Sequence, residues 1–373
     1  MRLRGRETRV VACPARPRVG DYLVYGYYPY WASSTSPPAM IAFEELTHVS
    51  HAFVWPRPDG SLHIPRLFNP TSLVQEAHAK KCKALLCVGG GGENSASFRH
   101  VTSNDALRAM LVRAVRGLVV THRYDGVEIN WEFPRDAEDG TNLVRLVHEL
   151  RDCLGTAALI SVTVNGSHHG SQHIDVRALC QVVDLFPVMT YDYHGSWSAV
   201  SGHNAPLLAY GGAEGDVSSG MAYWLARGLP RAKILLGLAF YGRSFDAVDV
   251  GHKFTRSRAH TYSEIALLRG NGYVRRWDAT AQVPYLLSEE KATLISYDDL
   301  LSLSKKIDYV KSEQFGGVMI WHVAGDIHRG RHWLLHGVGA CVRGARLLAG
   351  ALPQVAPDTS QERMILSQQP REK

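Results

Sequence analysis

The segment Gly126–Glu132, with the sequence GVEINWE, concentrates the side chains that can do chemistry. Successive side chains of a β-strand point to opposite faces, so Glu128, Asn130 and Glu132 share one face and the apolar residues share the other. Burying a carboxyl group costs free energy unless it is paired or protonated. Two acids and an amide in one row therefore indicate a proton-transfer site. For Glu128, the deepest of the three, a structural polar network is the stronger interpretation, and for Asn130 the two interpretations are balanced.

Further clusters with chemical potential follow later strands. Tyr191–His194 ends one of them, Phe240–Arg243 a second and Met319–Trp321 a third. Aromatic rings stack on the flat apolar faces of sugars, while acids and arginine hydrogen-bond the edges. Together these clusters predict a groove that binds carbohydrate, although the first of them alone is equally consistent with an ordinary turn.

The elements that must position these residues are short β-rich runs separated by segments that can form helices. Residues 141–155, for example, place five leucine and valine side chains on one helical stripe. Alternating strands and helices predict parallel pairing, and eight such units favour a (β/α)8 TIM barrel, an α/β fold. A doubly wound open sheet is the alternative, but no GxGxxG motif follows the first strand. The expected strands are 22–28, 47–53, 84–88, 126–132, 159–164, 183–190, 234–241 and 317–321.

The connection between the seventh and eighth expected strands is far longer than one helix requires, and its Thr, Tyr, Val and Trp residues favour a small α+β insertion lobe. We expect the barrel to span residues 21–345, with the lobe at about 247–290. A basic N-terminal tail over 1–20 and a polar C-terminal tail over 353–373 are expected to be disordered.

Composition excludes several classes of protein. Residues 1–18 hold six arginines and one glutamate, so most of the net charge of +6 belongs to the tail, which argues against nucleic acid as a partner. No apolar run approaches the roughly 20 residues of a membrane span. The histidines form no HExxH pair and the cysteines no CxxC pair, so we expect no metal.

The N-terminus has some features of an export signal. Arg2–Arg9 is basic, and Val10–Cys13 has the form of a lipoprotein cleavage box. An apolar stretch of about 7–15 residues, which export requires, does not lie between them. We therefore expect a disordered tail or the remnant of a misassigned start.

These motifs, taken in order, resemble the family 18 glycoside hydrolases, the chitinase family, from about residue 25 to residue 326. Asp125–Glu132 corresponds to the family's DGxDxDxE signature and Met189–Asp192 to its MxYD. The other matches are Gly26–Pro29, Ala52–Phe53, Phe240–Phe245, Pro284–Tyr285, Ser296–Asp299 and Gly316–Trp321. The resemblance implies the barrel fold with its inserted lobe.

The resemblance also implies retaining hydrolysis of β-1,4-linked N-acetylglucosamine chains, as in chitin or chito-oligosaccharides. Glu132 would protonate the glycosidic oxygen, and the substrate's own N-acetyl carbonyl would be the nucleophile. Tyr191 would bind the acetamido group, with Asn130 and Asp192 completing the catalytic set, and Asp125 and Glu128 would support it structurally. The implied sugar-contacting residues are Tyr27, Phe53, Met189, Tyr241, Arg243 and Trp321.

This chemistry implies no cofactor, and we expect a monomer. Because chitin lies outside cells, the resemblance implies an extracellular or cell-surface location.

Three positions depart from the family pattern. Glu128 and Asn130 each stand where the family has Asp, and Gly91 stands where the family's SxGGW motif has its Trp. An amide cannot ionise, so Asn130 is expected to lower the pKa of Glu132 relative to the family, which weakens hydrolysis and moves its optimum to lower pH. Gly91 removes a stacking platform, which another residue such as Trp197 would have to replace.

Two interpretations of function therefore stay open. Intact Glu132 and Tyr191 favour a hydrolase, whereas Asn130 and Gly91 favour a lectin-like protein that binds chitin oligosaccharides with little turnover. Cleavage of N-glycan cores or peptidoglycan-type sugars is a third, weaker interpretation.

Overall fold

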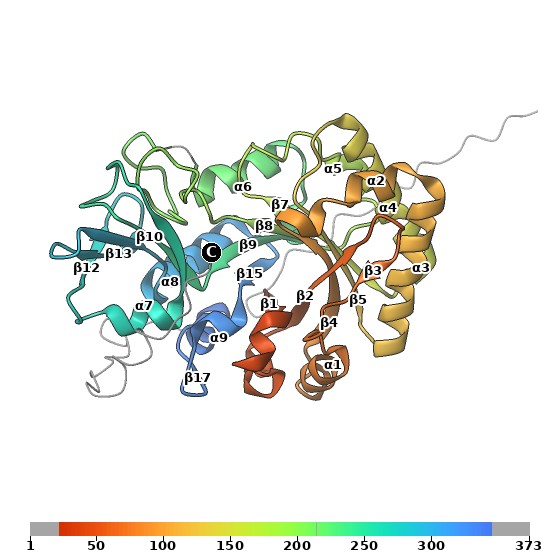
Figure 1. The fold of residues 1–373 in the computed structure, drawn as a ribbon, viewed down its shortest axis with the longest axis horizontal. Helices are drawn as coiled ribbons and strands as arrows, with labels where there is room; N and C mark the ends of the chain where they lie inside the picture. Colours follow the sequence, from red (N-terminus) through yellow and green to blue (C-terminus); the bar gives the residue numbers. More distant parts are fainter. Residues whose placement is uncertain (1–21, 214, 345–373) are drawn as a thin grey trace, which may run out of the picture.

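Parallel strands form a barrel at the centre of the computed structural model, which describes residues 22–213 and 215–344 (Figure 1). The tails expected over 1–20 and 353–373 lie outside the described residues. Strand β1 pairs in parallel with both the second and the last barrel strand. The barrel strands are β1 Leu23–Pro29, β2 His48–Pro56, β4 Lys83–Gly90, β5 Gly126–Trp131, β6 Leu159–Val162, β7 Val164–Asn165, β8 Phe186–Met189, β9 Ile234–Ala239 and β15 Gly317–Trp321.

Strands β6 and β7 occupy one position of the barrel, because β6 pairs with β5 and β7 pairs with β8. A parallel bridge between Ser161 and Leu185 joins the two sides at this position. The expected strand over 159–164 is thus broken at Thr163. The circular strand order confirms the (β/α)8 barrel and excludes the doubly wound open sheet.

Helices surround the barrel, and Figure 1 shows α2, α3 and α4 on the side opposite the lobe. Helix α4 begins before the predicted 141 because the Asp136 carboxylate accepts a hydrogen bond from the Asp139 backbone N–H and caps it. Within 22–213 and 215–344, no helix combines the length and apolar character needed to cross a bilayer. The helices are α1 Pro70–Ala79, α2 Phe98–Ser103, α3 Asp105–His122, α4 Ala137–Leu154, α5 Val176–Leu179, α6 Val217–Ala226, α7 Tyr262–Leu268, α8 Leu300–Glu313 and α9 Leu335–Val342.

The side chains of β5 divide between two layers, as the two-residue period predicts. Val127, Ile129 and Trp131 pack in the core between the barrel and its helices. Glu128 and Asn130 point to the barrel interior, where both are buried. The polar row of the sequence therefore lies inside the barrel, with Glu132 immediately after the C-terminal end of the strand.

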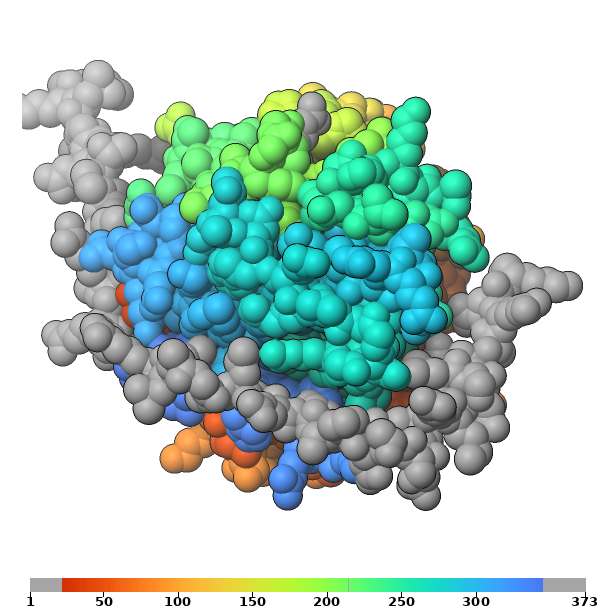
Figure 2. Space-filling view, turned by 90° about the vertical axis from the view of Figure 1, so that its left-hand side faces the viewer, coloured from red at the N-terminus to blue at the C-terminus, as the bar shows by residue number. Residues whose placement is uncertain are grey.

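Residues 241–296, which we call the insertion lobe, contain a five-stranded antiparallel sheet and α7, and Figure 2 shows the lobe in teal. Its strands are β10 Tyr241–Phe245, β11 Ser257–Thr261, β12 Val274–Asp278, β13 Val283–Ser288 and β14 Thr293–Ser296. The prediction that the seventh barrel strand continues to Tyr241 is wrong, because β9 ends at Ala239 and Tyr241 pairs with Thr261 in the lobe. The lobe sheet accordingly begins earlier and ends later than 247–290. The remaining short strands are β3 Leu62–His63, β16 Ile327–His328 and β17 Arg331–His332.

A buried ion pair attaches helix α8 to the end of the lobe. The Lys306 ammonium lies 2.6 and 2.7 Å from the two Asp298 carboxylate oxygens, and both side chains are buried. Removing one partner of such a pair leaves an uncompensated buried charge.

We predict that Lys306→Met lowers the free energy of unfolding by about 3–5 kcal/mol, measured by urea denaturation. The double variant Lys306→Met with Asp298→Asn, which buries no charge at this position, should recover much of that loss. A loss below about 1 kcal/mol in the single variant would contradict this role of the pair.

Candidate active site

Glu132 lies at the C-terminal end of the barrel strands, where barrel enzymes place reacting groups. Ser95 fixes its backbone: the Ser95 hydroxyl accepts from the Glu132 N–H at 2.9 Å and donates to the Gly90 carbonyl at 2.8 Å. Burial raises the pKa of Glu132 to about 7, with the negative charge of Asp192 adding to the rise and the Asn130 side chain opposing it. Near neutral pH this carboxyl group can therefore hold a proton and also release it.

Glu128 lies below Glu132 in the barrel interior and is fully buried. Its carboxylate accepts hydrogen bonds from the hydroxyls of Tyr25, Tyr27, Ser50 and Thr163. Burial raises the pKa of Glu128, while these four donors oppose the rise. Because strands β1, β2 and β5 all contribute to this network, it holds the barrel interior together and orients Tyr27.

Asn130 and Tyr191 each carry a buried polar atom that lacks a strong hydrogen-bond partner among the described residues. Asn130 is 3% exposed, and its Oδ1 has no partner among the described residues. The Tyr191 hydroxyl donates only to the Met319 sulfur, at 3.6 Å, and sulfur is a weak acceptor. Both residues line the same cavity of about 380 Å³. Asn130 Oδ1, an unpaired acceptor, and the Tyr191 hydroxyl, a weakly bonded donor, thus lie in the same cavity. Buried polar groups without strong partners need an explanation.

Asp192 connects the barrel to the insertion lobe. Its Oδ1 accepts hydrogen bonds from the Tyr241 hydroxyl at 2.5 Å and from the Arg243 guanidinium at 2.7 and 2.8 Å. Both donors belong to β10, the first strand of the lobe. The Arg243 guanidinium also lies over the Trp197 ring, 4.6 Å from its centroid, so one chain of contacts runs from Asp192 to an exposed aromatic ring.

Aromatic side chains form one wall of the smaller cavity. Trp321 stacks on Phe53 with their ring centroids 5.6 Å apart, and it meets the edge of Tyr27 at 5.4 Å. Trp31, 6.1 Å from Trp321, belongs to the same wall, although the sequence analysis missed it. Its position two residues after the Gly26–Pro29 motif, in the short 3-10 helix Tyr30–Ser34 that follows β1, is the signal that could have identified it.

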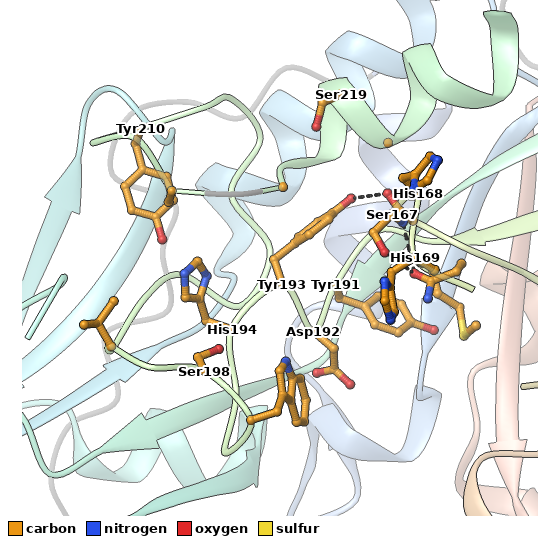
Figure 3. Close-up of a pocket in the computed structure, with 18 of the residues that line it drawn as sticks. Ser167, His168, His169, Tyr191, Asp192, Tyr193, His194, Ser198, Tyr210 and Ser219 are labelled. Carbon is orange, nitrogen blue, oxygen red and sulfur yellow. Dashed lines mark hydrogen bonds between the residues drawn. The ribbon is translucent and has the colours of Figure 1, made fainter. Parts of the chain in front are cut away.

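Two adjoining cavities meet at Glu132. The larger, of about 1300 Å³, shares Glu132, Met189, Tyr191 and Asp192 with the smaller one. Figure 3 shows the larger cavity with Tyr191, Asp192, His194 and Ser198 from one segment and Ser167, His168 and His169 from another. The carboxyl group of Glu132 therefore borders both halves of a groove.

Gly91, where the family's aromatic residue is missing, and Trp197, its suggested replacement, lie on different sides of Glu132. A Cβ atom at Gly91 would come within 3.2 Å of Glu132 Oε2, so residue 91 lies directly beside the carboxyl group. Trp197 lines the larger cavity and is 61% exposed. A flat exposed ring is thus present in the half of the groove that Trp321 does not line.

Of the sequence-predicted site residues, the structure does not bring Asp125 into the site. Asp125 precedes β5, at the opposite end of the barrel, where its Oδ2 accepts from His78 Nε2 and from the Ala84 N–H, each at 2.8 Å. The other predicted residues lie together along the smaller cavity or in the network below it: Tyr27, Phe53, Glu128, Asn130, Glu132, Met189, Tyr191, Asp192, Tyr241, Arg243 and Trp321.

Comparisons with known proteins agree with this geometry. Over 65% of its length the chain is 31% identical to probable chitinase 2 of Drosophila melanogaster. Over 82% of its length it is 29% identical to the oviduct-specific glycoprotein of Ovis aries. The aligned part covers 56% of the fly protein and 63% of the sheep protein, so the chain spans less than two thirds of either relative.

Among solved structures, the Group IV chitinase of Ostrinia furnacalis superposes with a TM-score of 0.80 at 25% identity, covering 86% of this chain and all of that one. The sequence profile of the glycosyl hydrolases family 18 matches residues 23–326. Because that match spans most of the sequence and the fold agrees with it, the chain belongs to glycosyl hydrolase family 18.

Proposed function

We propose that this protein hydrolyses β-1,4-linked N-acetylglucosamine chains, chitin or chito-oligosaccharides, with retention of the anomeric configuration. The observation that carries the proposal is the presence of two unsatisfied groups in one cavity. Asn130 Oδ1 is an acceptor without a donor, and the Tyr191 hydroxyl is a donor without a strong acceptor. One secondary amide satisfies both, since its N–H donates and its carbonyl oxygen accepts. The acetamido group of N-acetylglucosamine is such an amide.

The amide held in this way is also the nucleophile. Its carbonyl oxygen forms a bond to the anomeric carbon while the glycosidic C–O bond breaks, and Glu132 donates its proton to the departing sugar oxygen. The oxazolinium intermediate is then opened by water, whose proton returns to the Glu132 carboxylate. Glu132, with a pKa of about 7, is suited to both proton transfers.

The remaining side chains bind the sugar rings on either side of the broken bond. Trp321 and Phe53 offer flat apolar faces to the sugar that carries the nucleophile, and Asp192 and Arg243 hydrogen-bond its edge. Trp197 offers a face to the leaving group from the larger cavity, on the other side of Glu132 from Gly91. Acid catalysis with an internal nucleophile needs no further group. Because chitin is an extracellular polymer, the proposal implies action outside the cell or at its surface.

A lectin-like function is the second candidate, and Asn130 is the observation that favours it. The unpaired Oδ1 of Asn130 serves binding of the amide as well as an aspartate would. Its amide nitrogen, in contrast, cannot take part in proton exchange with Glu132. Binding would then exceed turnover.

We predict that the protein releases the fluorophore from 4-methylumbelliferyl chitobioside or chitotrioside, and that Glu132→Gln lowers kcat by at least about 100-fold because it removes the transferable proton. Binding of chitotetraose to both proteins, measured by calorimetry, serves as the control and should be retained in the variant. Binding with no turnover by the unaltered protein would support the lectin-like function, and a Glu132→Gln variant with unchanged kcat would contradict the role of Glu132.

We predict that Asn130→Asp raises the pKa of Glu132, because a negative charge replaces a hydrogen-bond donor. The fall in kcat at alkaline pH, expected near pH 7 in the unaltered protein, should move to higher pH. For each pH unit by which the alkaline limb moves, kcat at pH values well above the pKa rises by about 10-fold. At pH 7, kcat rises by less than about 2-fold. A pH–rate profile that is the same in both proteins would show that residue 130 does not set the ionisation of the acid.

A further inference from the structure

We propose that Asn204 is a positioning residue for the reaction, through which the insertion lobe holds Asp192 beside Glu132 and Tyr191. This inference rests on the proposed function, because it assigns Asp192 to the sugar-binding face of the active site. Asn204 belongs to none of the motifs that identify the family in this sequence, and it lines neither cavity.

Asp192 needs such a support because its backbone is left-handed, with φ of 62°. Residues other than glycine adopt this conformation infrequently, since it brings the side chain close to the following carbonyl. Asn204 provides two hydrogen bonds that hold it: its Oδ1 accepts from the Asp192 N–H at 3.2 Å, and its backbone oxygen accepts from the Tyr193 N–H at 3.1 Å. Asn204 is 1% exposed, so water does not compete for these bonds.

The insertion lobe in turn fixes Asn204. The Asn204 N–H donates to the Ser296 hydroxyl at 2.8 Å, at the end of strand β14. The neighbouring His203 ring lies between the same hydroxyl, at 3.4 Å, and Asp278 Oδ2 on β12, at 3.0 Å. His203 and Ser296 are both buried. Two strands of the lobe therefore bind the loop on which Asn204 lies.

The contacts close into a ring around Asp192. Ser296 on β14 is the cross-strand partner of Arg243 on β10, and the Arg243 guanidinium binds the Asp192 carboxylate. One pair of adjacent strands thus holds Asp192 at its backbone, through Asn204, and at its side chain, through Arg243. Figures 1 and 2 show this part of the lobe against the segment that follows β8, drawn in green.

This arrangement has a chemical consequence at Glu132. The negative charge of Asp192 is one of the two influences that raise the pKa of Glu132. If Asp192 turns away, that contribution is lost, and Glu132 releases its proton at lower pH. A variant that lowers stability but leaves the surroundings of Glu132 unchanged has no such effect on the pH profile.

The test compares Asn204→Leu, which removes the acceptor, with Asn204→Asp, which keeps it. The Asn204 amide nitrogen has no hydrogen-bond partner among the described residues, so the aspartate loses no hydrogen bond. At this buried position its carboxyl group is expected to be protonated and uncharged. We expect Asn204→Leu to lower kcat by about 10- to 100-fold and to move the alkaline limb to lower pH, and Asn204→Asp to restore most of kcat. Ser296→Ala, which leaves Asn204 in place, should act in the same direction with a smaller effect and covers the case that Asn204→Leu does not fold.

Thr102→Val is the matched control, because it removes one buried hydrogen bond, from the Thr102 hydroxyl to the Phe98 carbonyl in α2, on the other side of the barrel. It should lower stability without moving the pH profile. If Asn204→Leu and Ser296→Ala behave like Thr102→Val, the inference is wrong.

Crystal structures of the Asn204 variants separate this inference from the proposed function. If Asp192 in Asn204→Leu keeps both its positive φ and its contacts with Arg243 and Tyr241, the inference fails whatever the activity. If the unaltered protein neither turns over nor binds chito-oligosaccharides while Asp192 moves in the variant, the proposed function fails and the positioning role stands.

Discussion

The state of the Glu132 carboxyl group depends on how far the end of β5 is shielded from water. Burial favours its protonated form, and the charge of Asp192 adds to this effect, while the Asn130 amide stabilises the ionised form. The balance leaves the pKa near 7 rather than at the value of an exposed glutamate. In the proposed function, the remaining side chains of the site bind the substrate beside this acid.

The barrel and the insertion lobe each supply residues that surround Glu132. The barrel supplies Glu132, Asn130 and Tyr191. The buried Glu128 network beneath them joins β5 to hydroxyl groups of β1, of β2 and of Thr163, between β6 and β7. The lobe supplies Tyr241 and Arg243, which bind the Asp192 carboxylate. A carboxylate at the boundary between two sheets can influence the acid only if both sheets hold it. In the proposed function, the lobe is therefore a part of the catalytic geometry as well as a wall of the groove.

The sequence predicted the barrel and the polar side chains on the inner face of β5. The first follows from the alternation of strands with helices, and the second from the two-residue period of a strand. Alternation with period two puts Glu128, Asn130 and Glu132 on the inner face whatever the details of packing. The assignment of Tyr241 to a barrel strand failed for a related reason, since β9 and β10 are separated by one residue and nothing in the local pattern marks the change of sheet. Asp125 comes just before β5 and Glu132 just after it, so the two residues lie at opposite ends of the barrel.

Contacts between segments distant in the sequence could not be predicted. Asn204 reaches Asp192 through a loop, and Ser296 reaches Asn204 from more than 90 residues away. Trp31, which follows β1, lies beside Trp321 on the neighbouring strand β15, although the two are nearly 300 residues apart. None of these three contacts leaves a period in the local sequence, because all of them depend on where the strands end in space.

The most direct measurement for the central claim is a crystal structure of Glu132→Gln with chitotetraose bound. The claim predicts that the acetamido group of the sugar over Trp321 donates its N–H to Asn130 Oδ1 and accepts at its carbonyl oxygen from the Tyr191 hydroxyl, with that oxygen turned toward the anomeric carbon. An acetamido group that points to solvent, with Asn130 and Tyr191 still unpaired beneath it, would contradict the claim.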